Sequence, residues 1–499
     1  MPLKIYNSLT RRKEEFIPLH PEEVRMYVCG ITPYDLCHIG HARAALVFET
    51  IRRYVEFRGY RVIMVRNFTD VDDKIIARGA SLGLSWREVA DRFIAEYNQD
   101  MKTLGLGRAT FEPKATDHIP EMIHMVKALE EKGCAYAVEG SVYFEVRKFP
   151  LYGKLSHRNL DEMLAGARVE VDPRKRDPLD FALWKRSKEG EPAWDSPWGA
   201  GRPGWHIECS VMAIKYLGET IDIHGGGADL VFPHHENEIA QSESFTGKEF
   251  VRQWIHNGFV NIDSEKMSKS LGNFFTIREV LKQCDADALK LFLLSTHYRA
   301  PVDFSDRKLI ESEKALDRAQ LALQKVEGVA REGGGNGVPS RPLKEALQKA
   351  EEDFMEAMDD DFHTPRAIAS LFDMIRQLNG YLEEGIRDPF LAEAAARIRE
   401  LAGILGLMQR RRGIHYIENQ AATEISPREY QEARERLNLA IKAGSMPGPE
   451  DIGSVLIWRA QARKRSDWAT SDEIREWIEE IGVAVEDTRE GFYWKYRST

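Results

Sequence analysis

Two histidines, His38 and His41, flank an Ile-Gly pair in the stretch CHIGHARAALVFETIRRY, which turns apolar immediately afterwards. The start of a helix offers unpaired backbone N–H groups and the positive end of the helix dipole, and both favour a phosphate. Two imidazoles beside them would face the phosphate chain of a nucleotide. For a histidine pair taken alone, a polar helix start with satisfied imidazoles is the simpler interpretation.

A lysine-rich stretch, KMSKS, runs from Lys266 to Ser270 and is followed by LGN. Its two lysines, Lys266 and Lys269, would suit a clamp on a triphosphate, whose negative charge spreads further in the transition state. A solvated turn is the commonest fate of such a run. An early HIGH stretch and a late KMSKS stretch on one α/β chain form a specific pair, and in this pair the chain resembles a class I aminoacyl-tRNA synthetase.

Four residues carry side chains of the kinds that bind zinc: Cys29, Cys209, His234 and Glu238. His234 and Glu238 are four residues apart in FPHHENE, so a helix would place them on one face. His235 is the rival ligand, but its partner four residues on is the apolar Ile239, so we favour His234. Taken singly, the cysteines would be core thiols and the His–Glu pair a surface contact. Together, at strand ends and loops, the four predict a zinc site.

The elements that must position these residues alternate between strand and helix. The stretch VRMYVCG predicts a strand over 24–30, residues 43–57 an amphipathic helix, and YRVIMVRNFTD a second, largely buried strand over 60–70. This is a βαβ unit with parallel strands. Ligands of such sheets bind beyond the carboxyl ends of the strands, where Cys29, the two histidines and Thr69–Asp70 would converge.

Further along, TIDIHGGGADLVFPHHENEIAQSE predicts a strand, a glycine loop and a helix that opens at Pro233, and WIHNGFVNID predicts another short strand. Residues 114–198 are rich in Pro, Trp and charge, and predict an irregular segment inserted between the halves of the fold. After about Ser305, long amphipathic helices predict a bundle. They are interrupted by REGGGNGVPSR (331–341), which is typical of a flexible linker.

Composition narrows the class of protein. The chain has 499 residues, 43% of them hydrophobic, which predicts several domains rather than one. No apolar run is long enough to cross a bilayer, and the first residues lack the apolar core of a signal peptide. Five scattered cysteines argue against a disulfide framework, so we expect a cytoplasmic protein. The net charge of −10 leaves open whether a local basic face binds nucleic acid.

Motifs along nearly the whole chain resemble the cysteinyl-tRNA synthetase family, in the same order: CGITPYDLCHIGHAR, RNFTDVDDKII, GWHIECS, DIHGGGADLVFPHHENEIAQSE, KMSKSLGN and ARKRSDWATSDEIREWIEEIGVAVEDT. The resemblance implies an α/β fold with a Rossmann-like class I catalytic domain at 1–310, interrupted by the connective segment at about 114–198. It also implies an α-helical bundle domain at 311–410 and a small C-terminal anticodon-binding domain at 425–499.

The same resemblance implies roles for particular residues. Cys29, Cys209, His234 and Glu238 would hold one zinc ion per chain, and His38, His41, Lys266 and Lys269 would serve ATP, which enters with Mg²⁺. A further group is expected near the bound amino acid: Thr69, Trp205, His224 and Asp229. The implied partners are L-cysteine, ATP and tRNA(Cys), with no membrane and a monomeric chain.

Zinc beside an adenylating site has a chemical reason. Cysteine and serine differ by sulfur for oxygen, and pockets that read shape reject near-isosteres by only roughly a hundredfold. A thiolate bond to zinc discriminates further, so no editing domain is needed.

Two alternative functions remain. One is a ligase that transfers cysteine to an amine in small-thiol biosynthesis, which would lack the C-terminal domain. The other is a catalytically silent tRNA-binding paralogue, which would have lost a motif residue.

The C-terminal stretch RAQARKRSDW is basic, and the aromatic residues Trp477, Phe492, Tyr493 and Trp494 follow it. An ordinary small module with a solvated basic face explains such a run. By the resemblance, it reads the anticodon, where aromatic rings stack on unpaired bases and Arg side chains meet phosphates and base edges.

Overall fold

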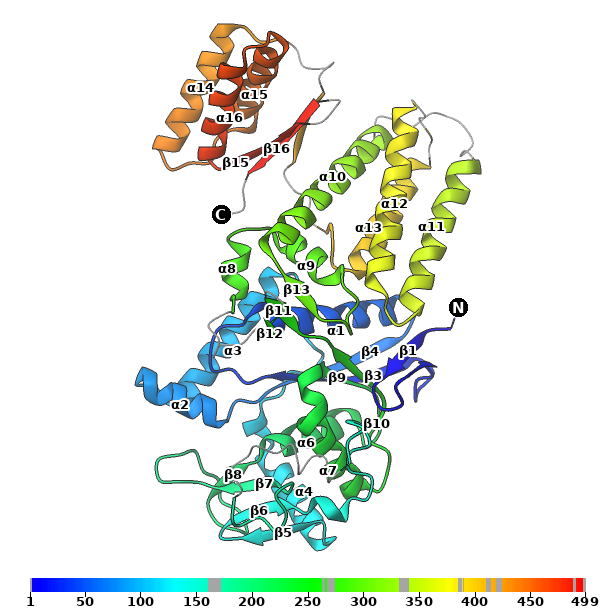
Figure 1. Ribbon diagram of the computed structural model, residues 1–499, viewed down its shortest axis with the longest axis vertical. Coiled ribbons are helices and arrows are strands. Elements are labelled where there is room, and N and C mark those ends of the chain that lie inside the picture. Colours follow the sequence, from blue (N-terminus) through cyan, green and yellow to red (C-terminus); the bar gives the residue numbers. More distant parts are fainter. Residues whose placement is uncertain are drawn as a thin grey trace.

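The computed structural model describes residues 2–159, 172–262, 265–266, 274–331, 341–384, 388, 390–409, 414–418, 424–487 and 491–496. Figure 1 shows three parts: an α/β region that contains both the blue N-terminal and the green central segments, a bundle of long helices beside it, and a small C-terminal unit beyond the bundle. None of the helices in these described residues combines the length and the hydropathy that a membrane-spanning segment requires.

A four-stranded parallel sheet forms the centre of the α/β region, in the order β10-β9-β3-β4. Its strands are β3 (Glu23–Ile31), β4 (Arg61–Phe68), β9 (Ile221–Gly227) and β10 (Val251–Asn257). The predicted βαβ unit is confirmed, with α1 (Ile39–Phe57) between β3 and β4. Alternate residues of β3 face opposite cores: Met26 and Val28 pack with α1, whereas Tyr27 and Cys29 pack with α6 (Trp205–Leu217) and α7 (Glu236–Thr246).

The helix α1 begins at Ile39, four residues before the predicted start at Arg43. The histidines themselves cap it: the His38 ring accepts a hydrogen bond from the N–H of Gly40, and the His41 ring accepts one from the N–H of His38. Because these imidazoles satisfy backbone donors that a helix start leaves unpaired, the helix begins ahead of its apolar stretch.

Two predictions for the segment after β8 (Gly201–Pro203) were wrong. The glycines of the predicted loop belong to β9, and a Cβ on Gly225 would lie 2.1 Å from the Phe48 ring of α1, so glycine permits close packing there. The helix α7 begins at Glu236 and not at Pro233, because Pro233 belongs to a preceding π-helical turn, η4 (Val231–His235), in which Phe232 has non-helical backbone. A short 3₁₀ turn, η3 (Ala228–Leu230), links β9 to it.

The inserted segment is more regular than the sequence predicted. It contains η1 (Ala115–His118), α4 (Ile119–Glu131), η2 (Val146–Lys148) and an antiparallel sheet in the order β5-β6-β7-β8. The first three of these strands are β5 (Ala135–Val138), β6 (Ser141–Phe144) and β7 (Phe181–Arg186), and β8 lies beyond the expected end at residue 198. The strands are too short for a clear alternation of apolar and polar residues, which is why the pattern looked irregular.

Other elements flank the central sheet. The hairpin β1 (Lys4–Asn7) and β2 (Arg12–Glu15) lies at the N-terminus, and α2 (Asp73–Leu82) and α3 (Trp86–Thr103) follow β4. The predicted strand WIHNGFVNID is two strands in different sheets, since β10 ends at Asn257 and β11 (Val260–Ile262) joins a second sheet, β12-β11-β13. That sheet also contains β12 (Glu265–Lys266) and β13 (Val302–Phe304), with α8 (Ile277–Leu281) and α9 (Ala286–Leu294) between them.

The predicted helix bundle is confirmed. Its helices are α10 (Asp306–Arg331), α11 (Arg341–Asp359), α12 (Thr364–Glu383) and α13 (Leu391–Ile404), and they share one hydrophobic core with α1 and α9. Most of the predicted linker, residues 332–340, lies outside the described residues.

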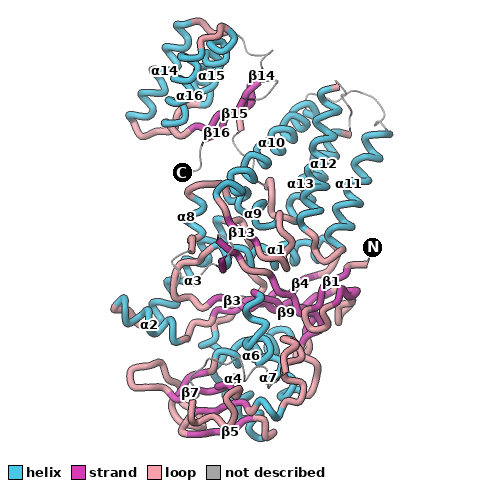
Figure 2. Tube along the Cα trace, in the orientation of Figure 1, coloured by secondary structure: helices cyan, strands magenta, loops and turns pink. Residues whose placement is uncertain are grey.

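The C-terminal unit packs three helices against an antiparallel sheet, β14-β16-β15. The helices are α14 (Pro427–Lys442), α15 (Pro449–Lys464) and α16 (Trp468–Glu480), and the strands are β14 (His415–Glu418), β15 (Val483–Asp487) and β16 (Gly491–Tyr496). Figure 2 shows β14 beside β15 and β16. Because β14 pairs with β16, the folded unit includes residues ahead of the expected start at 425.

Candidate active site and metal centre

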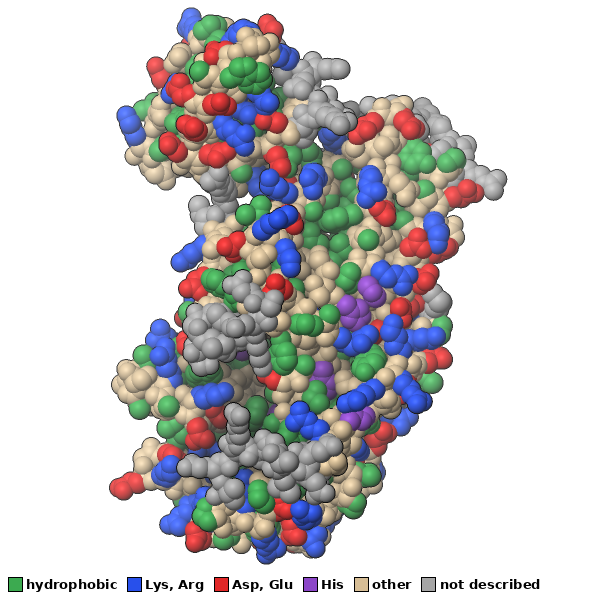
Figure 3. Space-filling view, viewed as in Figure 1, with side chains coloured by type: hydrophobic (Ala, Val, Ile, Leu, Met, Phe, Trp, Pro, Cys, Tyr) green, Lys and Arg blue, Asp and Glu red, His purple; other side chains and the backbone are tan. Residues whose placement is uncertain are grey.

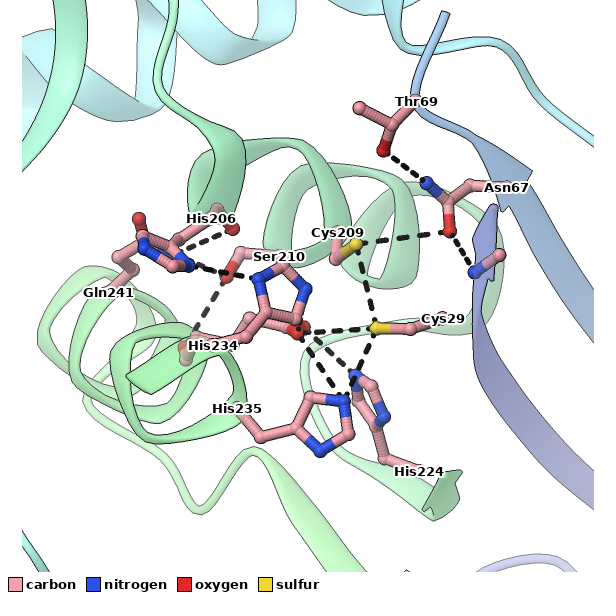
Figure 4. Close-up of polar contacts among 12 residues, drawn as sticks. Cys29, Asn67, Thr69, His206, Cys209, Ser210, His224, His234, His235 and Gln241 are labelled. Carbon is pink, nitrogen blue, oxygen red and sulfur yellow. Dashed lines mark hydrogen bonds and ion pairs between the residues drawn. The ribbon is translucent and has the colours of Figure 1, made fainter. Parts of the chain in front are cut away.

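Four side chains that the sequence singled out meet in the core between the central sheet and the helices α6 and α7 (Figure 4). Cys29 comes from β3, Cys209 from α6, His234 from the turn η4 and Glu238 from α7. One donor atom of each lies within 4.8 Å of all the others. Cys209, His234 and Glu238 are buried, and Cys29 is partly exposed.

The distances between donor atoms fit a tetrahedral zinc site. The two sulfurs are 3.7 Å apart, and Sγ of Cys29 is 3.5 Å from Oε1 of Glu238, which lies 3.0 Å from Nε2 of His234. Zinc–sulfur bonds of about 2.3 Å at tetrahedral angles place two sulfurs about 3.8 Å apart. Two thiols, an imidazole and a carboxylate also form a donor set that suits zinc chemically.

A second set of four donors shares two of these residues. Cys29 and Glu238 also lie within reach of His224 and His235, so that these four could hold a metal as well. Nε2 of His235 is 3.3 Å from Sγ of Cys29, and Nε2 of His224 is 2.9 Å from Oε2 of Glu238. The rival ligand of the sequence analysis, His235, is thus close to the site, but it belongs to the set of donors that does not include Cys209.

The cluster is electrostatically coupled. A hydrogen bond from Cys29, helped by His234, lowers the pKa of Cys209 to about 6. Burial opposes charge on Glu238, but the rings of His224 and His234 hold the pKa of this carboxyl well below its usual range. Burial also opposes charge on His234, and the neighbouring Glu238 and Cys209 outweigh it and raise the pKa of this imidazole to about 10. The cluster therefore favours the anionic forms of Cys209 and Glu238, whereas burial and the neighbouring Cys209 raise the pKa of Cys29 and the charged partners keep His234 protonated. Binding of a metal ion would displace a proton from Cys29 and from His234.

Two histidines around the cluster, His206 and His256, were missed by the sequence analysis. Nδ1 of His206 lies 2.9 Å from Nδ1 of His234, and Nδ1 of His235 lies 2.8 Å from Nε2 of His256, whose Nδ1 contacts the Ser8 hydroxyl. Such outer imidazoles orient the inner ones. The sequence does contain a signal for them, because histidines are concentrated in one part of the chain. Five of the 14 lie within residues 206–256: His206, His224, His234, His235 and His256.

The residues expected around the amino acid lie at or near this cluster. Thr69 accepts a hydrogen bond from the Asn67 amide, whose oxygen contacts Sγ of Cys209 at 3.8 Å. Trp205 is 38% exposed and stacks on the His234 ring at 4.3 Å. Asp229 is exposed and lies just past the carboxyl end of β9. His224 pairs directly with Glu238, closer to the metal cluster than the sequence suggested.

The histidine segment is tied to the residues that follow the lysine stretch. The rings of His38 and His41 stack with centroids 3.9 Å apart at the N-terminus of α1. The N–H of Ile39 donates to the Phe275 carbonyl, and the N–H of Ile277 donates to the Cys37 carbonyl. Lys266 ends β12, whereas Lys269 lies outside the described residues.

Comparison with known protein families covers all three parts of the chain. A family described as "tRNA synthetases class I (C) catalytic domain" matches residues 15–314. A DALR domain matches residues 353–409, within the bundle, and a "Cysteinyl-tRNA ligase anticodon binding domain" matches residues 448–494.

Curated relatives match from end to end. The chain is 52% identical to the cysteine--tRNA ligase of Geobacter sulfurreducens over 499 residues, covering 100% of both chains. It is 48% identical to the cysteine--tRNA ligase of Thermodesulfovibrio yellowstonii, covering 99% of this chain and 100% of that one.

Among solved structures, a Mycobacterium tuberculosis methionyl-tRNA synthetase in complex with methionyl-adenylate gives a TM-score of 0.58 at 16% identity, covering 77% of this chain and 89% of that one. An Agrobacterium radiobacter LeuRS–tRNA–LeuAMS complex gives 0.58 at 14% identity, covering 79% and 86%. At this identity the likeness concerns the fold, which is that of class I synthetases. With the catalytic family model and the full-length relatives, it follows that the chain belongs to the cysteine--tRNA ligase family of class I aminoacyl-tRNA synthetases.

Proposed function

We propose that this chain activates L-cysteine with Mg-ATP to give cysteinyl-adenylate and pyrophosphate, and then transfers the cysteinyl group to the 3′ end of tRNA(Cys). Family membership supports the reaction. The observation that carries the choice of cysteine is the convergence of Cys29, Cys209, His234 and Glu238 within 4.8 Å beside the parallel sheet.

In the first step, the carboxylate of cysteine attacks the α-phosphate of ATP in line, and pyrophosphate leaves. No enzyme nucleophile is required, so catalysis consists of positioning and charge stabilisation. His38 and His41 stand at the N-terminus of α1, where backbone N–H groups and the helix dipole also favour phosphate. We assign Lys266 and Lys269 of the KMSKS stretch to the phosphates as well, because the chain after this stretch is hydrogen-bonded to the histidine segment through Phe275 and Ile277.

Selection of cysteine over serine is assigned to the metal cluster. Cys29, Cys209, His234 and Glu238 would hold the ion, one per chain, and the spacing of their donor atoms supports this set. A zinc ion held there would supply a direct bond to the substrate thiolate, which the hydroxyl of serine cannot match at neutral pH. Around it we assign Thr69, Trp205, His224 and Asp229 to the bound amino acid.

We assign recognition of tRNA(Cys) to the C-terminal unit. Figure 3 shows several Lys and Arg side chains gathered between this unit and the α/β region. At the end of α15, the Arg465 guanidinium lies 4.8 Å from the Trp458 ring, and the Arg463 guanidinium lies 5.9 Å from the half-exposed Trp468 ring. Such pairs of basic and aromatic groups suit unpaired bases.

We propose that the catalytic domain spans 1–310, the bundle domain spans 311–410 and the C-terminal domain starts before β14. We also propose that the enzyme is monomeric.

The test is cysteine-dependent exchange of pyrophosphate into ATP, run beside serine, with metal content determined on the same protein. We expect exchange with cysteine alone, on protein that carries about one zinc per chain, as a single four-ligand site requires. Equal exchange with serine would contradict selection by the metal. Absence of exchange with either amino acid would contradict the proposed reaction.

A further inference from the structure

The side chain of Arg43 is 0% exposed, and it lies on α1 only two residues after His41. Its guanidinium contacts carbonyl oxygens: Nη1 donates to Phe259 at 2.8 Å, and Nη2 donates to Ala300 and, at 3.3 Å, to His297 and Tyr298. Within the described part of the chain, no carboxylate forms an ion pair with it. A buried cation without a counter-ion is costly, so these bonds call for a reason beyond simple packing.

The bonded carbonyls belong to two turns that support the lysine-bearing sheet. Phe259 joins β10 to β11, and Ala300 joins α9 to β13. The strand β11 pairs in parallel with β13 and antiparallel with β12, which contains Lys266. Figure 1 shows α1, β11 and β13 close together. One guanidinium on α1 thus bonds both turns that lead into this sheet.

The two turns are packed so closely that little else could join them. The N–H of Gly258 donates to the Tyr298 carbonyl at 2.8 Å, and a Cβ on Gly258 would lie 2.5 Å from the Ala300 carbonyl oxygen. A planar guanidinium can donate in two directions at once, whereas a lysine ammonium is a single point. The geometry therefore requires arginine rather than any cation.

On the far side of the lysine stretch, the chain returns to the same helix start. The N–H of Ile277 donates to the Cys37 carbonyl at 3.0 Å, and Thr276 forms an isolated antiparallel bridge with His38. The residues before and after the lysine stretch are thus both anchored at the beginning of α1, one side through the Arg43 side chain and the other through backbone bonds.

We propose that Arg43 is a positioning residue for ATP. It sets β11 and β12, and with them Lys266, at a fixed place relative to His38 and His41, so that the two halves of the nucleotide site meet one triphosphate. The proposal rests on the proposed function, since it assigns the site to ATP. Arg43 is not expected to affect the metal cluster, because its side chain does not contact that cluster.

The test compares Arg43→Lys and Gly258→Ala with the unchanged protein. Arg43→Lys keeps the charge but cannot bond both turns. Gly258→Ala leaves Arg43 in place but forces the turns apart. In pyrophosphate exchange at a temperature where all three proteins are folded by circular dichroism, we expect each variant to lose about tenfold or more in kcat/KM for ATP, because small misplacements of reacting groups are costly. Cysteine binding, by equilibrium dialysis, and zinc content should stay unchanged.

Arg58→Lys is the matched control. Arg58 lies at the other end of the same helix and pairs with Asp359 of the bundle, so the variant perturbs α1 without touching either turn. We expect it to lower the melting temperature while leaving kcat/KM for ATP unchanged.

Three outcomes would overturn the proposal. These are unchanged ATP kinetics in Arg43→Lys, parallel loss of cysteine binding and ATP kinetics, and the same kinetic loss in Arg58→Lys. If Arg43→Lys does not fold, Gly258→Ala decides the matter alone. Failure of the proposed function is distinguishable, because the unchanged protein would then show no cysteine-dependent exchange.

Discussion

The backbone N–H of Ile39 donates a 3.2 Å hydrogen bond to the carbonyl of Phe275. These residues are far apart in the sequence, yet one begins the helix that carries the two histidines and the other follows the lysine stretch. The contact brings the chain that bears the KMSKS motif back to the histidine segment, although Lys269 itself lies outside the described residues.

Replacing Lys269 with Ala should therefore lower cysteine-dependent pyrophosphate exchange and leave zinc in place, because the loss concerns charge at the phosphates and not the metal cluster. Rates of exchange and metal analysis on the same preparation measure both effects. Lys282→Ala, an exposed lysine at the end of α8, is the control and should behave as the unchanged protein. An unchanged exchange rate in Lys269→Ala would remove this lysine from the mechanism.

The two neighbouring histidines of η4 can be told apart by metal content. His234 contacts Glu238 at 3.0 Å within the set that includes both cysteines, so His234→Asn should lose most of the zinc. His235→Asn should keep the ion with affinity reduced by roughly tenfold, as expected for an outer partner of a ligand. Zinc titration against a chelator measures the difference. The reverse result would assign the ion to the set formed by Cys29, His224, His235 and Glu238.

Removing the C-terminal unit should separate the two reaction steps. A chain that ends after Gln409, ahead of β14, should still exchange pyrophosphate with cysteine, because the cluster and the histidine segment are intact, but should no longer charge tRNA(Cys). Cutting before β14 avoids leaving a strand without its partner β16. Some loss of stability is expected, since Lys495 pairs with Glu313 and Asp317 of α10. Retained charging would show that tRNA recognition lies elsewhere.

The C-terminal unit should also respond to acid through one carboxyl. Buried Arg459 donates two 2.8 Å bonds to Asp487, and these bonds hold the pKa of Asp487 below its usual value. The stabilisation is complete above the unfolded-state pKa of about 3.9 and is lost as the pH falls through the lower folded-state pKa.

Asp487→Asn should accordingly destabilise this unit by about 2 kcal/mol at neutral pH, because it removes the negative charge that accepts both hydrogen bonds from the buried Arg459. The difference from the unchanged protein should shrink below about pH 4. Hydrogen exchange of the β15 and β16 amides measures this loss of stability within the C-terminal unit. The exposed Asp472, replaced by Asn, is the control. An effect that stays constant from neutral to acid pH would exclude the ion pair as its cause.

Long and strongly patterned elements were predictable from the sequence. The βαβ unit around α1 and the bundle helices have enough residues for their periodicity to show. The inserted sheet was not, because β5 and β6 have four residues each and β6 pairs with β7 across a long separation in sequence. The start of α1 was misplaced because the cap is made by histidines, which are not among the usual N-cap residues.

The candidate site was partly predictable for a similar reason. The four-residue spacing of His234 and Glu238 indicates that they share a helix face, and the position of Cys29 near a strand end indicates a ligand there. His206 and His256 carry no such spacing, since their partners, His234 and His235, come from other elements. Only the packing of α6 and β10 against η4 reveals them.

The cluster joins residues made at very different times during synthesis. Cys29 and its neighbour Glu238 are 209 positions apart. As the ribosome releases the chain from its N-terminus, β3, α1 and β4 emerge early, while β9 and α7 follow only after the inserted segment. Cys29 therefore has no contact with Glu238 until the ribosome has released that residue. The proposed metal ion can therefore bind all four side chains only after most of the α/β region has left the ribosome.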